Sequence, residues 1–343
     1  MKIVLNNSNL DIVKGESSNG YVAYYANKVV FNSDTLIGDF CFKVLTGGNY
    51  LARYIGNESK VTLPEAYKGN NYGIGNYAFF DCPNLNTVIL SKAIDKVEPF
   101  AFTDNTGNTI ISFINVTDDN EYFRSEDGIL FSKDMTKLVR YPEGKEGSTY
   151  NIPETVTRIA DNAFLKCTAL SSITVPADAT SIDNGAFNGC SSIPSISLPD
   201  MVTSIGEETF ASCSRLRIVE LGRSVTSIGT DAFKDCTKMR QIKCYSQEPP
   251  MCEEGALSEL DTWDCTLFVP EGAEALYKAA DQWKEFFFIE GITSIDTPKV
   301  NDSKNTTYDI YDMSGRRVRK AATTTDGLKA GLYIINGRKV LVE

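Results

Sequence analysis

The sequence predicts a solenoid, a fold in which copies of one short structural unit stack along an axis. A phenylalanine recurs at positions 164, 187, 210 and 233, so the chain repeats every 23 residues over four consecutive copies. Each of these phenylalanines lies five positions after an isoleucine and is followed by a short apolar run. Stacking such copies places equivalent residues above one another and buries a continuous core that one copy could not bury alone.

Further copies extend the array towards the amino terminus. Ile74–Phe79 and Val97–Phe102 resemble the later copies and lie 23 residues apart, and Ile37–Phe42 is a more divergent copy. We therefore expect the array to cover residues 36–250.

The array contains an insert. The separation between Phe102 and Phe164 exceeds two periods, so we expect additional structure near residues 115–150. Two strand-like runs, 128–131 and 137–141, flank a turn-like segment and predict a hairpin there.

One copy shows how each unit is expected to fold. After Phe164, Ile173 and Val175 alternate with polar residues as in a half-buried strand, which Pro176 ends. This pattern predicts short β-strands on one face of the solenoid and irregular or turn structure on the other.

The nine cysteines follow the repeat in part. Five of them occupy one repeated position and are expected as buried, reduced thiols: Cys82, Cys167, Cys190, Cys213 and Cys236. No two cysteines have the C-x-x-C spacing, so a zinc site is not expected. Beyond the array, Cys252 and Cys265 either form a disulfide or remain thiols together with Cys244.

Composition restricts the function. The chain has 343 residues and a net charge of −11, which repels phosphate backbones and anionic lipid surfaces, so no nucleic-acid partner is expected. It has no histidine, the commonest general base and zinc ligand. The carboxylates of Asp118, Asp119 and residues 143–146 lie among loop residues and are expected to be solvated. We therefore expect no enzyme activity, catalytic residues, cofactor or metal.

Membrane insertion is not expected either. No apolar run reaches the length of about 18 residues that a membrane-spanning helix needs, and the first ten residues lack the apolar core of a signal peptide. This observation leaves the compartment open.

Both ends of a solenoid need caps, because the terminal repeats would otherwise expose the core. We expect residues 1–35 to form the amino-terminal cap, with strands near 21–25 and 28–31. Residues 251–295 are expected to form a helical carboxy-terminal cap, with the helix over Glu271–Phe288. We expect Trp283, Phe286 and Phe287 to seal the core rather than to stack a ligand.

The remaining chain differs in character. Residues 296–307 are polar and predict a linker. Residues 308–343 contain two strand-like pairs around Ser314–Gly315 and Asn336–Gly337, which predict a small β-module.

The repeated pattern I-G-x-x-A-F-x-x-C-x-x-L-x-x-I-x-L-P closely resembles the BspA-like leucine-rich-repeat family. Leucine-rich repeats have a period of roughly 20 to 29 residues. One position of these repeats accepts asparagine or cysteine. In this chain that position holds Asn105 in one copy and a cysteine in five others. The resemblance implies a non-enzymatic, secreted or cell-surface protein that binds an extracellular protein partner, such as a host matrix protein, or adheres to other cells.

The carboxy-terminal tail resembles the sorting modules of proteins exported by type nine secretion in Gram-negative anaerobes. It has the pattern D-x-S-G-R-x-V followed by G-L-Y-I-x-x-G-x-K-V. The matching positions are Asp312, Gly315, Arg316, Gly331, Tyr333, Gly337 and Lys339. The resemblance implies a secreted protein, or one at the outer membrane or cell surface of a Gram-negative bacterium, with or without cleavage of the tail.

The period also predicts a binding surface. Side chains next to the buried strand positions should lie on the concave side of the solenoid, and the predicted face comprises Thr87, Ile89, Ser112, Ser172, Thr174, Ser195, Ser197, Arg217, Glu220, Arg240 and Lys243. Its middle is rich in hydroxyl groups, and charge appears only towards the carboxy-terminal end. Such a face either binds through weak, repeated contacts or is simply a solvated sheet surface.

Carbohydrate capture is the alternative function. A carbohydrate-binding module of a glycan-capture system would be favoured if the insert formed a groove lined by Tyr122, Phe123 and Tyr141.

Overall fold

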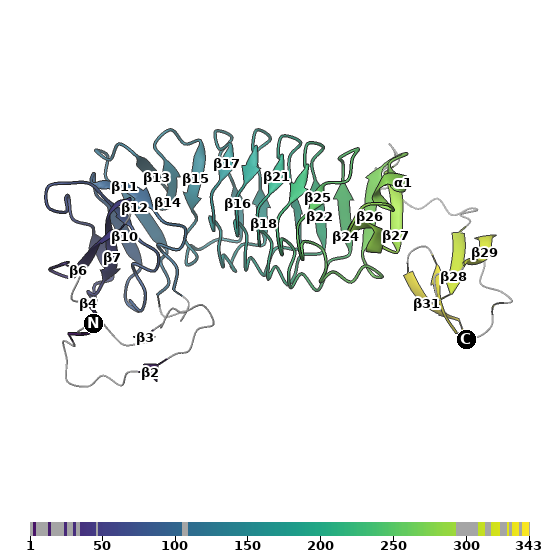
Figure 1. Ribbon diagram of the computed structural model, residues 1–343, viewed down its shortest axis with the longest axis horizontal. Coiled ribbons are helices and arrows are strands. Elements are labelled where there is room, and N and C mark those ends of the chain that lie inside the picture. The colour runs from purple at the N-terminus through teal and green to yellow at the C-terminus, as the bar shows by residue number, and fades with distance from the viewer. Residues whose placement is uncertain are drawn as a thin grey trace. The chain divides into compact units, whose positions relative to one another are not determined.

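The computed structural model describes residues 35–292 apart from 46 and 105–108, together with short segments at both ends of the chain. The terminal segments are 3–4, 13–14, 24–25 and 30–31, and 308–312, 317–322, 328, 331–335 and 338–342. The chain divides into two compact units. Unit 1 comprises residues 1–147 and 158–169, and unit 2 comprises residues 148–157 and 170–343. Figure 1 shows short strands repeated along both units.

The first sheet of unit 1 begins as an antiparallel meander and continues as a parallel ladder. Gly47 and Gly48 join the second and third strands with φ of +106° and +136°, a backbone conformation that glycine adopts without strain. From β7 onwards the strands pair in parallel, as stacked repeats require. The order is β5 (Thr35–Ile37), β6 (Phe40–Leu45), β7 (Gly48–Tyr54), β9 (Tyr72–Ile74) and β11 (Ile94–Val97).

Unit 1 contains two further sheets between residues 60 and 159. One is parallel and contains β8 (Lys60–Thr62), β10 (Thr87–Leu90) and β12 (Phe113–Val116). The other begins with antiparallel strands β13 (Phe123–Glu126), β14 (Ile129–Ser132) and β15 (Lys137–Arg140) and then pairs β15 in parallel with β17 (Arg158–Ile159). The antiparallel strands lie in the segment where the sequence predicts an insert, and β13 adds a strand that the sequence pattern did not indicate.

Residues 148–157 and 170–292 of unit 2 form parallel ladders. The major one has the order β20 (Ser195–Ser197), β22 (Ile218–Leu221), β24 (Gln241–Cys244), β26 (Thr266–Pro270) and β27 (Phe288–Ile292). A separate pair joins β16 (Thr149–Asn151) to β18 (Ser172–Thr174). The predicted solenoid of stacked short strands is confirmed.

Each repeat of unit 2 has a second strand, where the sequence pattern predicted irregular structure. These strands are β19 (Ser181–Ile182), β21 (Ser204–Ile205), β23 (Ser227–Ile228) and β25 (Met251–Cys252), and they pair in parallel. The isoleucines of the first three are the first residues of the repeated I-G-x-x-A-F segment and are buried. A β-branched side chain packed into a stacked core favours an extended backbone even over two residues.

An aromatic stack runs through the core of each unit. In unit 2 the ring of Phe210 is 5.5 Å from that of Phe187 and 5.3 Å from that of Phe233, with interplanar angles of 3° and 11°. In unit 1 Phe79 stacks on Phe102, and Tyr141 stacks on Phe164. All these rings are buried. One ring above another at each turn holds successive repeats in register.

The cysteine position of the repeat stabilises the turn before it. The thiols of Cys213 and Cys236 donate hydrogen bonds to the carbonyl oxygens of Phe187 and Phe210, at 3.2 and 3.1 Å. Like these two, Cys82, Cys167 and Cys190 are buried, and all nine cysteines lie in the described residues without a disulfide. Cys252 and Cys265 are therefore thiols, which decides between the two alternatives left open above.

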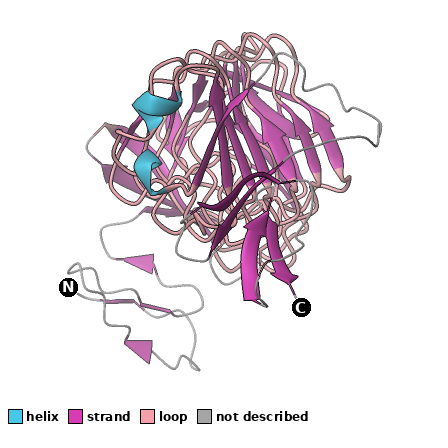
Figure 2. Cartoon of the chain, turned by 90° about the vertical axis from the view of Figure 1, so that its right-hand side faces the viewer, coloured by secondary structure: helices cyan, strands magenta, loops and turns pink. Residues whose placement is uncertain are grey.

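The prediction of a helix over Glu271–Phe288 is wrong. The segment contains only α1 (Glu274–Tyr277) and one 3-10 turn, η1 (Trp283–Glu285), which Figure 2 shows as two short cyan segments. Gln282 between them has a φ of +64°, which breaks a helix. The indole Nε1 of fully buried Trp283 donates a hydrogen bond to the Pro250 carbonyl at 2.8 Å, so tertiary packing outweighs the weak helix preference of a short segment.

Apart from residue 328, the described terminal segments are β-strands. β28 (Tyr308–Asp312), β29 (Arg317–Ala322), β30 (Gly331–Ile335) and β31 (Arg338–Val342) form one antiparallel sheet with the order β29-β28-β30-β31. Near the amino terminus, β1 (Ile3–Val4) pairs with β4 (Val30–Phe31), and β2 (Val13–Lys14) pairs with β3 (Tyr24–Tyr25). The expected linker 296–307 and the turns at Ser314–Gly315 and Asn336–Gly337 lie outside the described residues.

Candidate binding face

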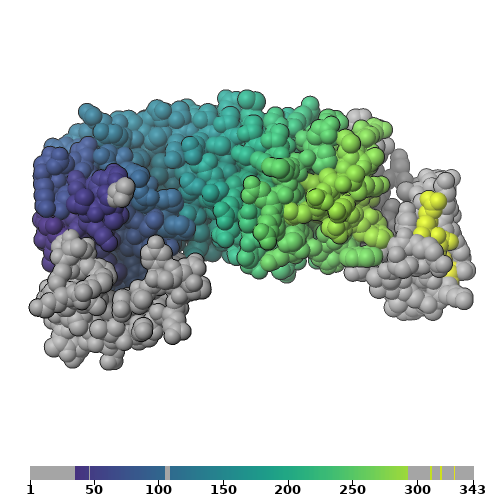
Figure 3. Space-filling view, in the orientation of Figure 1, coloured from purple at the N-terminus to yellow at the C-terminus, as the bar shows by residue number. Residues whose placement is uncertain are grey.

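The major ladder of unit 2 presents a regular outer surface. Along β22, Val219 and Leu221 are buried, whereas Ile218 and Glu220 between them are half-exposed, and the other strands alternate in the same way. We call the outward side chains of β16, β18, β20, β22, β24, β26 and β27, with the residues that directly precede these strands, the strand face of unit 2. Figure 3 shows one face of the repeats in space-filling form.

Hydroxyl groups occupy the strand face where it begins. Ser172 and Thr174 on β18 and Ser195 and Ser197 on β20 are all exposed. The Thr174 hydroxyl donates a hydrogen bond to the Asn151 side-chain oxygen on β16 at 2.8 Å. This part of the face is uncharged.

Charge follows on the next two rungs. Glu220 on β22 lies opposite Lys243 on β24, and their side chains form an ion pair at 3.0 Å. Arg217 and Arg240 directly precede these strands and are exposed. The backbone N–H of Arg240 donates to the Arg217 carbonyl at 2.8 Å, so the two arginines occupy equivalent positions on adjacent turns.

The strand face extends two rungs beyond the predicted residues. Thr266 and Phe268 on β26, and Phe288 and Glu290 on β27, are the outward residues there. The repeat spacing did not reveal them, because the step from Ile242 to its partner Leu267 is longer than the period and the step from Leu267 to Ile289 is shorter. The strand-like run Leu267–Pro270 was the available signal.

Three predicted residues lie in unit 1. Thr87 and Ile89 are outward, half-exposed residues of β10. Ser112 is not on a strand but directly precedes β12. The residue that pairs with Thr87 is Phe113, and the step between these two residues is longer than one period. The Ser112 hydroxyl donates to the Gly144 carbonyl at 2.8 Å, so this side chain is engaged within unit 1.

The insert does not form the aromatic groove that would favour carbohydrate capture. Tyr122 is exposed and Phe123 is half-buried, but Tyr141 is buried in the aromatic stack against Phe164. Tyr141 lies one period before Phe164, so the repeat itself already placed it in the core.

A small pocket lies among the described residues of unit 1. Glu98, Lys137, Arg140 and Asp161 contribute charged groups to its lining, and it encloses about 50 Å³. Ligand pockets usually enclose at least roughly 300 Å³. The pocket is therefore too small for a substrate of ordinary size.

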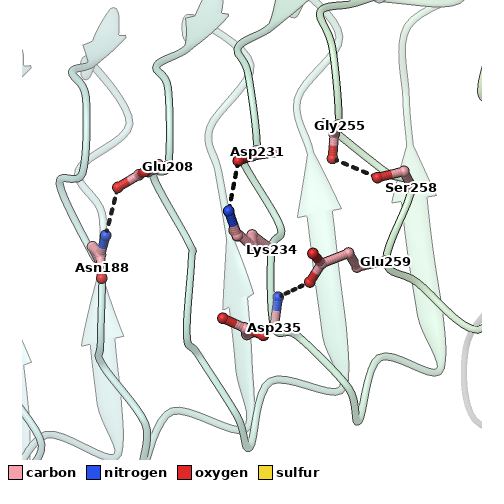
Figure 4. A network of polar contacts seen from close by, with 8 residues as sticks. All are labelled: Asn188, Glu208, Asp231, Lys234, Asp235, Gly255, Ser258 and Glu259. Carbon is pink, nitrogen blue, oxygen red and sulfur yellow. Dashed lines mark hydrogen bonds and ion pairs between the residues drawn. The ribbon is translucent and has the colours of Figure 1, made fainter. Parts of the chain in front are cut away.

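Carboxylates in the turns of unit 2 bind polar groups of the same turn or of the neighbouring turn. Asn188 donates to Glu208 at 3.2 Å, and the backbone N–H of Asp235 donates to Glu259 at 2.9 Å (Figure 4). Lys234 pairs with Asp231 at 2.9 Å (Figure 4). Within the described residues, no group of three or more cysteine, aspartate or glutamate side chains is placed to hold a metal ion.

The described part of the chain also lacks any helix with the length and apolar character needed to cross a membrane.

Comparison with known families identifies the repeat. The family described as "BspA type Leucine rich repeat region" matches in six copies over residues 48–127 and 144–249. Together these two stretches make up more than half of the chain. The chain belongs to this family. Its strand ladders are therefore those of leucine-rich repeats. A comparison with curated proteins gives no match.

Solved structures of leucine-rich-repeat proteins are similar at low identity. A leucine-rich repeat protein from Eubacterium ventriosum is 23% identical over 62% of this chain, with a TM-score of 0.39. This chain spans only 47% of that protein. The pneumococcal vaccine antigen PcpA is 16% identical, with 85% of this chain and 99% of PcpA covered and a TM-score of 0.47. A leucine rich cell surface protein from Faecalibacterium prausnitzii is 19% identical, with 76% and 95% covered and a TM-score of 0.39.

Proposed function

We propose that this leucine-rich-repeat chain is a non-enzymatic interaction protein that binds an extracellular protein partner through the strand face of unit 2. The supporting observation is the strand face itself. Its successive rungs present exposed hydroxyl and guanidinium groups and half-exposed aromatic rings on a rigid array of short strands. A rigid face binds without the cost of ordering a loop, and repeated weak contacts add up when many copies share one surface.

The site of action that we propose is the cell surface or the extracellular space. Membership of the BspA type family and the resemblance of the tail to type nine sorting modules support this proposal. In this scheme residues 308–343 direct export from a Gram-negative bacterium, and the strand face provides adhesion to host matrix proteins or to other cells.

The adhesion proposal predicts saturable capture of the full chain by immobilised fibronectin or fibrinogen. Ser197→Trp places a bulky ring on the strand face and should abolish capture, because the partner can no longer approach the sheet. Ser214→Trp, on an exposed turn of the same unit, should leave capture unchanged. Surface plasmon resonance measures both. Equal binding by the two variants would contradict the use of the strand face.

One observation favours carbohydrate binding as a second candidate. Trp263 is 41% exposed and stacks on Phe287, with a ring separation of 4.4 Å and an angle of 17°. A flat, supported indole is a surface on which a sugar ring can stack. Trp263→Ala should abolish retention of the chain on a polysaccharide affinity gel without changing capture by a matrix protein.

A further inference from the structure

We infer that the segment bound by the strand face of unit 2 is an acidic peptide segment of the partner protein, with carboxylates that bind Arg217 and Arg240. This inference rests on the proposed function and names the chemistry of the partner. The two arginines are exposed, and they precede neighbouring strands whose backbones are hydrogen-bonded at this point. Neither guanidinium forms an ion pair with a carboxylate of the described residues.

The two arginines differ from the charged residues next to them, which form an ion pair. On the same two turns, Glu220 and Lys243 neutralise each other at 3.0 Å. Arg217 and Arg240 have no such compensation, and like charges on neighbouring strand positions destabilise a sheet. A guanidinium presents a planar fork that matches a carboxylate in two hydrogen bonds. Two adjacent forks therefore form a receptor for carboxylates supplied from outside the chain.

One guanidinium is held in place by the chain itself. A terminal nitrogen of Arg240 donates a hydrogen bond to the Met239 carbonyl at 2.8 Å. This bond limits the rotamers of the side chain and adds no negative charge beside it. A partly ordered guanidinium loses less conformational freedom when it binds a carboxylate.

The charge of the rest of the molecule supports this assignment. The whole chain has a net charge of −11, and the turns of unit 2 carry Glu208 and Glu259 on their surface. An acidic segment is repelled by those turns and attracted to the arginines, so charge alone orients it towards the strand face.

The surroundings of the arginines favour a peptide over a uniformly charged polymer. The rung on one side, Ser195 and Ser197, carries no charge. On the other side Phe268 and Phe288 offer apolar surface, and Glu290 repels a second run of anions. A sulfated polysaccharide carries charge along its whole length, whereas the next cation of the strand face, Lys243, is already paired with Glu220. A peptide with a pair of carboxylates beside apolar side chains matches both features.

The experiment uses the full chain and a fluorescein-labelled peptide that contains paired glutamates flanked by leucines, with a lysine version as the counterpart. Fluorescence anisotropy should show binding of the glutamate peptide and none of the lysine peptide. Arg217→Gln and Arg240→Gln should each weaken binding about fivefold, and raised salt should weaken the wild type most. The control is Arg223→Gln, which changes an exposed arginine of the same unit that lies 3.5 Å from Asp200 and is not part of the strand face.

Each other outcome overturns the inference. Unchanged affinity in both glutamine variants, or an equal loss in Arg223→Gln, would show that the two arginines are not the receptor. Tighter, arginine-dependent binding of heparin than of the peptide would assign the site to a sulfated polysaccharide. Urea unfolding tests whether a loss of binding is due to a loss of folding. Arg217→Gln removes the repulsion between Arg217 and Arg240, so its urea midpoint should be unchanged or higher.

The failure of this inference is distinguishable from the failure of the proposed function. If the glutamate peptide does not bind but matrix-protein capture is still lost in Ser197→Trp, the acidic partner is wrong and the strand face remains the binding surface. If the peptide binds in an arginine-dependent manner and matrix proteins do not, the acidic partner holds and the host-matrix proposal falls.

Discussion

At the scale of single residues, the repeated cysteine acts through its hydrogen bond and its burial. The Cys213 thiol lies in the core and donates to the carbonyl of Phe187, one turn earlier. Asparagine has the same capacity to donate to a backbone carbonyl, which gives a physical reason for the interchange of the two residues at this position. Burial raises the pKa of the Cys213 thiol, so the group stays protonated and remains a donor.

We predict that Cys213→Ala destabilises unit 2 by about 1 to 3 kcal/mol, because the buried Phe187 carbonyl loses its thiol donor and the small cavity adds to the loss. Urea unfolding followed by circular dichroism measures the change. Cys252→Ala is the control, since this thiol is half-buried and its sulfur is 3.7 Å from its nearest acceptor, the Pro250 carbonyl. Equal losses in the two variants would mean that the thiol hydrogen bond contributes nothing specific.

At the scale of the repeat element, close stacking of turns explains the glycine of the I-G segment. A Cβ atom at Gly206 would lie 2.5 Å from the backbone nitrogen of Asn184, and one at Gly229 would lie 2.6 Å from that of Glu207. Both obstacles belong to the backbone of the preceding turn, which cannot rotate away. Glycine at this position therefore sets how closely consecutive turns approach.

We predict that Gly229→Ala destabilises the protein by at least about 2 kcal/mol, because the turns must separate and weaken the parallel pairing of β21 with β23. Ser224→Ala, at an exposed position of the same repeat, should change stability by less than about 0.5 kcal/mol. Thermal unfolding gives both values, and hydrogen exchange at Ile228 locates the damage. Normal exchange there in Gly229→Ala would argue against the close-approach explanation.

At the scale of the whole molecule, the buried thiols make stability depend on alkaline pH. Burial raises the pKa of Cys167, Cys236, Cys252 and Cys265 to about 12, against 9.0 for an ordinary thiol. Unfolded thiols therefore lose their protons near pH 9, while the folded protein keeps them. The stability that these thiols contribute is complete below pH 9 and is lost as the pH rises towards about 12.

We predict that the free energy of unfolding falls by about 1.4 kcal/mol per pH unit for each such thiol above pH 9. Urea unfolding over a pH series measures the slope. Cys236→Ala should make the slope shallower by the contribution of one thiol and leave the pH dependence below 9 unchanged. A flat profile up to about pH 11 would show that the thiols are not protected from ionisation in the fold.

The period of the sequence predicts the residues of the candidate face only where the repeats have a constant length. Ser197, Glu220 and Lys243 pair in succession on consecutive rungs, as a constant period predicts. The step is longer between Thr87 and Phe113 and between Ile242 and Leu267, so Ser112 falls before its strand, and Phe268 on the next rung was not anticipated. Loop lengths at irregular turns are set by local packing, which the hydrophobic pattern of the strands does not encode.

The sequence by itself determined the solenoid, its repeat period, the buried cysteine position and the family. Those properties follow from side chains that recur at a fixed spacing, and a fixed spacing can be stacked in few ways. The tertiary structure decided the second strand of each repeat, the nearly helix-free carboxy-terminal cap and the final rungs of the strand face. In each of these places a short segment takes its conformation from the turn against which it packs, because its own local preference is too weak to fix it.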